Sequence, residues 1–180
     1  MYQVEATKAE VSALSTAWQG ERLDDGRPLV PDHVLDELRN ATSEQVWHVL
    51  SHAGYKYHFC GGWQGVFPDR VTVGRGGTAQ FVPKRADLDT AVLEFGSARE
   101  GVYGDQQNAW VVDMLRPGDI LGAALFGKVC EGTVIGDNLG TAIAARTGVG
   151  AIIDGGVRDL DGLSRAPSPV NFYFRGVDPT

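Results

Sequence analysis

The sequence has little of what marks a secreted, membrane-spanning or nucleic-acid-binding protein. Its two cysteines, Cys60 and Cys130, lie in no CxxC pair, so nothing suggests a disulfide framework. No apolar run approaches the roughly 18 residues that a membrane helix needs, and the first residues have no signal-peptide pattern. Acidic residues outnumber basic ones by 23 to 16, and the net charge of -7 disfavours binding to phosphate backbones. We therefore expect a cytoplasmic protein that binds neither membranes nor nucleic acids.

Several common catalytic motifs are also absent. The sequence contains neither a GxxxxGK[ST] or GxGxxG phosphate loop nor the Gly-x-Ser-x-Gly elbow of serine hydrolases. The glycine-rich stretches 61–65 and 74–77 are therefore expected to form tight turns.

Three histidines, His48, His52 and His58, lie close together in the sequence, with Cys60 two residues further on. A zinc site is one interpretation, because the first two are one helical turn apart. No HExxH glutamate or paired CxxC accompanies them, and the surrounding residues are aromatic. Histidines that pack in the core or line a substrate site are the preferred interpretation.

The order of helical and extended patterns indicates an α/β fold. At 180 residues and 43% hydrophobic composition, the chain fits one domain with its own core. We expect residues 1–40 to form a helical arm, and residues 41–180 to form the compact domain. The expected helices are 9–19, 31–39, 44–53 and 84–100, the third with a capping box; the expected strands are 71–73, 79–82, 110–112 and 120–126; a polar loop is expected at 101–108.

The most informative stretch runs from Gly136 to Asp159. Residues 138–147 have small and apolar side chains at helical spacing, which predicts a helix capped by Asp137 and ended by Gly148. Residues 148–153 are expected to form a buried parallel strand, and the Asp-Gly-Gly sequence that follows predicts a turn.

The lengths of this helix and strand bring their outer ends together. Ten helical residues rise roughly 15 Å, and five or six extended residues return roughly 16 to 20 Å. Asp137 should therefore meet the adjacent pair Arg158-Asp159, beside the amide groups of residues 138–140. An arginine fork, free amides and two carboxylates predict a site for a small anionic substrate with a divalent cation. A helix cap and a surface ion pair are the simpler interpretation of each residue alone.

This pattern, an aspartate followed by 20 residues and an Arg-Asp pair, resembles the RraA-like superfamily, and within it the class II, metal-dependent pyruvate aldolases. The Pro-Gly-Asp sequence at 117–119, the strand at 77–81 and the segment 174–179 are similar to further family motifs. The likeness extends from about residue 42 to the last residue. It implies a three-layer swivelling β/β/α domain, here with an N-terminal helical arm, assembled into a homotrimer or homohexamer.

The resemblance also implies a reaction. Members of this branch cleave a 4-hydroxy-2-oxo acid to pyruvate and a second carbonyl compound, and oxaloacetate decarboxylation is an expected side activity. The resemblance assigns Mg²⁺ or Mn²⁺ to Asp159 and the substrate carboxylate or enolate to Arg158. It places the substrate carboxylate against the backbone at Gly136, Asn138 and Leu139, and makes Asp137 orient the water that takes the 4-hydroxyl proton.

The sequence departs from the family pattern in places. His48 stands where the family often has aspartate, and Phe81 replaces a threonine. Family members continue for several dozen residues beyond the segment that ends here, and that part supplies an acidic group to a neighbouring subunit's site, so we expect a C-terminally truncated domain. A non-catalytic branch, whose members bind ribonuclease E, lacks the aspartate of the Arg-Asp pair. The presence of Asp159 favours the enzyme branch over a regulatory protein-binding ring.

Overall fold

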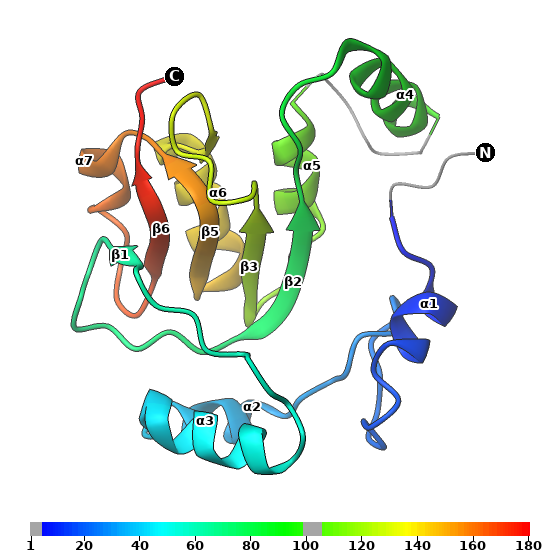
Figure 1. Ribbon diagram of the computed structural model, residues 1–180, viewed down its shortest axis with the longest axis vertical. Helices are drawn as coiled ribbons and strands as arrows, with labels where there is room; N and C mark the ends of the chain where they lie inside the picture. The colour runs from blue at the N-terminus through cyan, green and yellow to red at the C-terminus, as the bar shows by residue number, and fades with distance from the viewer. Residues whose placement is uncertain (1–4, 99–105) are drawn as a thin grey trace.

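A single six-stranded sheet forms the centre of the computed structural model, which describes residues 5–98 and 106–180 (Figure 1). The strands follow the order β1-β6-β5-β3-β2, and β4 also pairs with β5. Only β1 runs antiparallel to its neighbour, so the carboxyl ends of the other five strands share one edge. The strands are β1 Gln64–Gly65, β2 Arg75–Gln80, β3 Asp119–Ala124, β4 Thr133–Ile135, β5 Gly150–Val157 and β6 Asn171–Val177.

The described helices lie around this sheet, with α1 and α4 further out on the side of β2 (Figure 1). They are α1 Lys8–Ala13, α2 Asp32–Leu38, α3 Ser43–His52, α4 Ala86–Ser97, α5 Gln107–Asp113, α6 Asp137–Thr147 and α7 Leu160–Leu163. In Figure 1, α5 and α6 lie behind the sheet, α7 lies at its carboxyl edge, and α2 and α3 lie beneath the amino ends of the strands. The expected α/β class is confirmed. Within the described part of the chain, no helix has both the length and the apolar character that a membrane span requires.

The core lies between α6 and the middle of the sheet. Ile143 of α6, Ile153 of β5 and Phe172 of β6 have no exposed surface. The predicted packing of this helix against this strand is therefore confirmed. Gly148 ends α6 in the left-handed conformation, with φ 69°, as predicted.

Local side-chain hydrogen bonds determine where the helices near the N-terminus begin and end. The capping box at Thr42 and Gln45 is present, and α3 begins at Ser43. The helix expected at 9–19 is shorter and covers only Lys8–Ala13. Beyond that point the Arg22 guanidinium binds the carbonyl oxygens of Ser15 and Trp18, at 2.8 and 3.2 Å, and so holds a turn rather than a continuing helix.

Five expected local structures are wrong. Residues 110–112 are helical in α5 rather than extended, because the Trp110 ring packs against Gly96 of α4. Residues 71–73 form no strand, because β2 starts at Arg75. The stretch 74–77 is therefore mostly strand and not a turn. The stretch 61–65 ends in β1 instead of forming a turn. The sequence at 154–156 continues β5, with a local irregularity, instead of turning. Most of the loop expected at 101–108 lies outside the described residues, and its last two residues belong to α5.

The N-terminal segment is anchored to the amino edge of the sheet by a buried ion pair. Arg27 Nη2 lies 3.0 Å from Asp119 Oδ2, and the Asp119 side chain is only 1% exposed. Arg27 also pairs with Asp25 at 2.9 Å. Burial alone would lower the pKa of the Arg27 guanidinium, but hydrogen bonds to Asp119 and Asp25 outweigh this and raise it above its ordinary value. On the same edge, Arg75 donates to the Val30 carbonyl oxygen at 2.8 Å.

Candidate functional site

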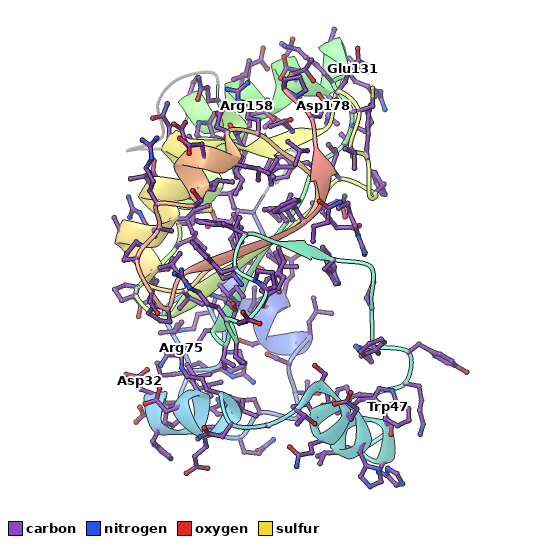
Figure 2. All side chains as sticks on the ribbon, turned by 90° about the vertical axis from the view of Figure 1, so that its left-hand side faces the viewer. Asp32, Trp47, Arg75, Glu131, Arg158 and Asp178 are labelled. Atoms are coloured by element: carbon purple, nitrogen blue, oxygen red, sulfur yellow. The ribbon has the colours of Figure 1, made fainter. Side chains whose placement is uncertain are left out.

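The candidate site lies where β4 and β5 end at the carboxyl edge of the sheet. Strand β4 leads through Gly136 into α6, and β5 leads through Arg158 and Asp159 into α7. The Arg158 backbone N–H donates to the Ile135 carbonyl oxygen at 3.1 Å, which fixes the two strand ends side by side. Figure 2 shows Arg158 at the end of the molecule opposite Asp32 and Arg75. Ligands of parallel α/β sheets bind at this kind of edge.

Gly136 lies directly beneath the Arg158-Asp159 pair. A Cβ atom added at Gly136 would lie 2.6 Å from Asp159 Oδ2 and 3.1 Å from Arg158 Nε. Any side chain here would displace the carboxylate, so glycine is what permits this close approach. Since Asp137 follows directly, the structure brings Asp137, Arg158 and Asp159 to one place, as expected, although β5 is longer than the predicted strand.

Helix α7 closes over Asp137 through another glycine. A Cβ atom at Gly162 would lie 2.3 Å from Asp137 Cβ and 3.0 Å from its Oδ2. One turn along α6, Gly140 makes the matching contact, where an added Cβ would lie 2.1 Å from Leu163 Cδ2. Gly162 is a residue of the site's framework that sequence reasoning missed. Its only signal is its position three residues after Asp159.

The start of α6 differs from the expectation. Gly136, not Asp137, is the N-cap residue, and the N-cap makes no side-chain hydrogen bond. Asp137 is already the first helical residue, so its carboxylate cannot fold back as a cap and lies against Gly162 instead. The Gly140 amide, expected to be free, donates to the Gly136 carbonyl oxygen at 2.9 Å. The amides of Asn138 and Leu139 belong to the first turn, whose N–H groups have no partner within the helix.

Arg158 and Asp159 are held by their backbone and leave their side chains open to solvent. Arg158 Nε and Asp159 Oδ2 are 3.4 Å apart, and the two side chains are 49% and 48% exposed. The Asp159 backbone is left-handed, with φ 58° and ψ 46°, and its carbonyl oxygen accepts the Leu163 N–H at 3.1 Å. Aspartate is among the few residues that adopt this conformation readily. This backbone places the carboxylate over Gly136.

The donor set fits a hard divalent cation. Mg²⁺ is usually held by one or two carboxylates, and water and substrate oxygens complete its coordination. Asp159 and Asp137 provide two carboxylates around the Gly136–Gly162 framework. Across residues 5–98 and 106–180, no three His, Cys, Asp or Glu side chains cluster closely enough to hold a metal by themselves. A cation here would therefore take its remaining ligands from water and substrate.

A cavity of about 530 Å³ lies elsewhere, at the amino edge of the sheet, between α2 and the start of β3. Its charged lining includes Arg75 and Asp119, both of which are engaged by the N-terminal segment. The chemistry predicted from the sequence lies on the opposite edge, on an open surface.

The histidines lie away from the candidate site. His48, His52 and His58 are all exposed, and the first two belong to α3. Figure 2 shows Trp47, on the same helix, at the opposite end of the molecule from Arg158. The part of the preferred interpretation that placed them in the core is wrong, because α3 buries only Ser51 and the three imidazoles are exposed. The substrate-lining role stays a prediction.

Comparisons with known proteins show the family and the fold. Residues 36–178 match the RraA-like family, described as Aldolase/RraA. The fold is similar to that of Streptomyces coelicolor RraAS2, described as an unusual member of the RNase ES inhibitor RraA protein family (23% identity, TM-score 0.60, 83% of this chain and 66% of that chain). It is also similar to an uncharacterized protein from Pseudomonas syringae pv. tomato (22% identity, TM-score 0.59, 89% of this chain and 64% of that chain). The RNA-processing inhibitor RraA from Thermus thermophilis is a more distant match (15% identity, TM-score 0.52, 78% of this chain and 70% of that chain).

No curated protein matches the sequence significantly. The chain spans slightly less than two thirds of the length of the first two solved structures. At these identities, the structural matches establish the fold.

Proposed function

The chain belongs to the RraA-like family, and from this premise we propose that it is a divalent-metal-dependent lyase of the class II pyruvate aldolase type. Its substrate class is a 4-hydroxy-2-oxo acid, which it cleaves to pyruvate and a second carbonyl compound. Oxaloacetate decarboxylation passes through the same pyruvate enolate and is the expected side activity.

One observation carries this proposal: an arginine and two carboxylates pack against two glycines, Gly136 and Gly162, at the start of a helix. A Cβ atom added at Gly136 would lie 2.6 Å from Asp159 Oδ2 and 3.1 Å from Arg158 Nε, and Asp137 lies against Gly162. A surface that only binds a protein has no need of such close backbone approach. A site for a small anion and a cation does need it, because backbone amides, a guanidinium and carboxylates must all contact the same small ligand and its cation.

The substrate carboxylate binds at the amino end of α6. The amides of Asn138 and Leu139 and the backbone at Gly136 form an anion-binding surface there, reinforced by the helix dipole. Arg158, half exposed and only 3.4 Å from Asp159, can turn its planar fork toward the carboxylate or the 2-oxo oxygen.

Mg²⁺ or Mn²⁺ held by Asp159 would supply Lewis-acid polarisation of the 2-oxo group. Asp137 accepts the proton of the 4-hydroxyl group, directly or through a water molecule. The bond between C3 and C4 breaks, the C4 oxygen becomes the carbonyl of the second product, and the electron pair remains on the pyruvate fragment as an enolate. Arg158 stabilises the developing negative charge, and protonation at C3 releases pyruvate.

We also propose that the working form is a homotrimer or homohexamer in which a neighbouring subunit covers the site. Two features support this. The side chains of Arg158 and Asp159 are about half exposed, whereas a site that develops charge gains from excluding water. Leu14, at the end of α1, is 88% exposed, and an apolar arm of this kind favours an interface.

A non-catalytic regulator is the second candidate. The structural similarity to Streptomyces coelicolor RraAS2 and to the Thermus RraA inhibitor supports it. In that case the chain would bind a ribonuclease partner, and the Arg158-Asp159 surface would carry no turnover.

Pyruvate release separates the two candidates. We expect the protein to release pyruvate from oxaloacetate and from 4-hydroxy-4-methyl-2-oxoglutarate in Mg²⁺, and to lose this activity in EDTA. Asp159→Asn should abolish the Mg²⁺-dependent rate, whereas Asp161→Asn, two residues along the same segment, should keep it. Asp161 is the matched control because it is exposed and pairs with Arg165 outside the site.

Three results would contradict the lyase. One is equal rates for the two asparagine variants. The second is activity that survives EDTA and is trapped by borohydride, which would indicate a Schiff base. The third is no turnover together with inhibition of a ribonuclease E, which would assign the chain to the regulators.

A further inference from the structure

We propose that His48 and His52 form half of a Zn²⁺ site on α3, and that a second copy of the chain supplies the other half. The pair lies at the opposite end of the molecule from Arg158 and takes no part in the proposed lyase chemistry. Both histidines are exposed, so their presence is not explained by packing.

The geometry of the pair suits two bonds to one metal ion. The residues are four apart on a regular helix, the spacing that places two imidazoles on one face. Their ring centroids are 4.2 Å apart and the ring planes differ by 40°. Two Zn–N bonds of about 2.0–2.1 Å at a tetrahedral angle place the two nitrogen atoms about 3.4 Å apart. The same geometry places the two ring centres about 5 Å apart, so the rings need to move apart by about 1 Å to bind one ion.

The His52 ring makes a hydrogen bond that favours the tautomer able to bind a metal through Nε2. His52 Nδ1 lies 2.8 Å from the backbone carbonyl oxygen of His48. A carbonyl oxygen only accepts, so Nδ1 is the donor in this contact, and the Nδ1–H tautomer of the ring has its lone pair on Nε2. An imidazole that donates one N–H to a carbonyl and offers the other nitrogen is the usual arrangement of a metal-binding histidine.

The position on the helix also favours a cation. His52 lies in the last turn of α3, where the partial negative charge of the helix terminus attracts positive charge. Zn²⁺ with imidazole ligands is preferred here over Mg²⁺, which selects oxygen ligands.

The site is incomplete within one chain. In the described part of the chain, no third His, Cys, Asp or Glu joins the pair, whereas protein-bound Zn²⁺ takes four ligands in most structural sites. A two-fold axis through the metal would bring His48 and His52 of a second copy and complete a tetrahedral set. The same contact would cover apolar side chains that α3 leaves in water, since Trp47 is 50% exposed and Val49 is 66% exposed.

The test is a Zn²⁺ titration of the full chain by calorimetry, with light scattering, in millimolar Mg²⁺ so that oxygen sites are filled. We expect one Zn²⁺ per two chains, and a mass that rises to at least twice the zinc-free value. His52→Gln should weaken Zn²⁺ binding roughly tenfold or more and remove the mass change. His33→Gln, an exposed histidine on α2, and Cys60→Ser, an exposed thiol, should leave both unchanged.

Other outcomes overturn the proposal. One Zn²⁺ per chain with no change in mass would show a site that needs no second copy. Loss of binding in Cys60→Ser would move the site to the thiol. Binding that is unchanged in His52→Gln, or absent from the wild-type protein, would leave no role for the pair.

Discussion

The two edges of the parallel sheet use the same residue types in opposite ways. At the amino edge, Arg27 and Asp119 are 3.0 Å apart, and their side chains are 19% and 1% exposed. At the carboxyl edge, Arg158 and Asp159 are 3.4 Å apart, and their side chains are about half exposed. The Arg27 guanidinium directs its hydrogen bonds to Asp119, Asp25 and the Gly76 carbonyl oxygen. This buried pair therefore holds the chain together. A pair that is loose and open to solvent retains hydrogen-bonding capacity for a ligand.

The glycines around the two pairs sharpen this contrast. At Gly136 an added Cβ would meet the Asp159 carboxylate at 2.6 Å, whereas Gly76, whose carbonyl oxygen accepts a hydrogen bond from Arg27, has nothing within 4 Å. A Cβ atom would therefore clash with the charged pair at Gly136 but not at Gly76. Substitutions at the amino edge should change stability, and substitutions at the carboxyl edge should change turnover.

The largest expected effect is on stability, from Arg27→Met. Removing the guanidinium leaves Asp119 buried without its charged partner, which typically costs about 3–5 kcal/mol. Urea unfolding measures the loss, and pyruvate release per folded molecule should stay at the wild-type rate. Arg146→Met is the matched control: it breaks an exposed pair with Asp113 and should cost less than about 1 kcal/mol. Equal costs for the two variants would remove the distinction between buried and exposed pairs.

The next effect is on turnover, from Arg158→Lys and Arg158→Ala. A lysine cannot reproduce the planar two-pronged contact, so both variants should lose roughly 10²-fold or more in kcat. Their urea midpoints should match that of the wild type, because the Arg158 side chain is half exposed. A lysine variant with wild-type kcat would exclude Arg158 from the mechanism.

A smaller effect is expected from Gly136→Ala. The added methyl group would push the Asp159 carboxylate aside, and Mg²⁺ activation should need roughly tenfold more metal. Gly76→Ala provides the control, because its methyl group enters open space. If the two alanine variants had the same Mg²⁺ dependence, the close contact between Gly136 and the Asp159 carboxylate would have no part in cation binding.

The smallest effect is a dependence on pH at the amino edge. Burial raises the pKa of Asp25, but hydrogen bonds from the Arg27 backbone and side chain outweigh this and hold it below its ordinary value. The carboxylate therefore contributes stability above its ordinary pKa, and this contribution is lost as the pH falls through the lowered value. Asp25→Asn should flatten the acid side of the stability curve slightly, while pyruvate release at neutral pH stays unchanged. A curve of unaltered shape would contradict this coupling.

The sequence predicted α6 and its surroundings better than it predicted the sheet. The left-handed end of α6 at Gly148 and the burial of Ile153 follow from local rules of helix ends and hydrophobic pattern. Those rules depend on residues close in sequence, so they hold before the fold is known. Asp137 lies near the Arg158-Asp159 pair as expected, although β5 is longer than the predicted strand.

The errors arose where distant contacts decide the backbone. The Asp-Gly-Gly sequence at 154–156 predicts a turn, yet Gly155 and Gly156 continue β5, because backbone atoms of Lys128, Val129 and Gly132 pack within 3.4 Å of where their Cβ atoms would be. Residues 110–112 favour a strand by composition, but they are helical in α5, and this places the Trp110 ring against Gly96 of α4. Neither neighbour can be identified from the local sequence.

The left-handed backbone at Asp159 also determines how easily this protein could change its role during evolution. Asparagine and glycine adopt the same conformation without strain, and each would remove the carboxylate while leaving α7 and the strand end in place. Natural selection could therefore discard the cation ligand in one substitution without endangering folding. A lineage built on this fold can pass from a charged to an uncharged surface at this position, and back, while the scaffold persists.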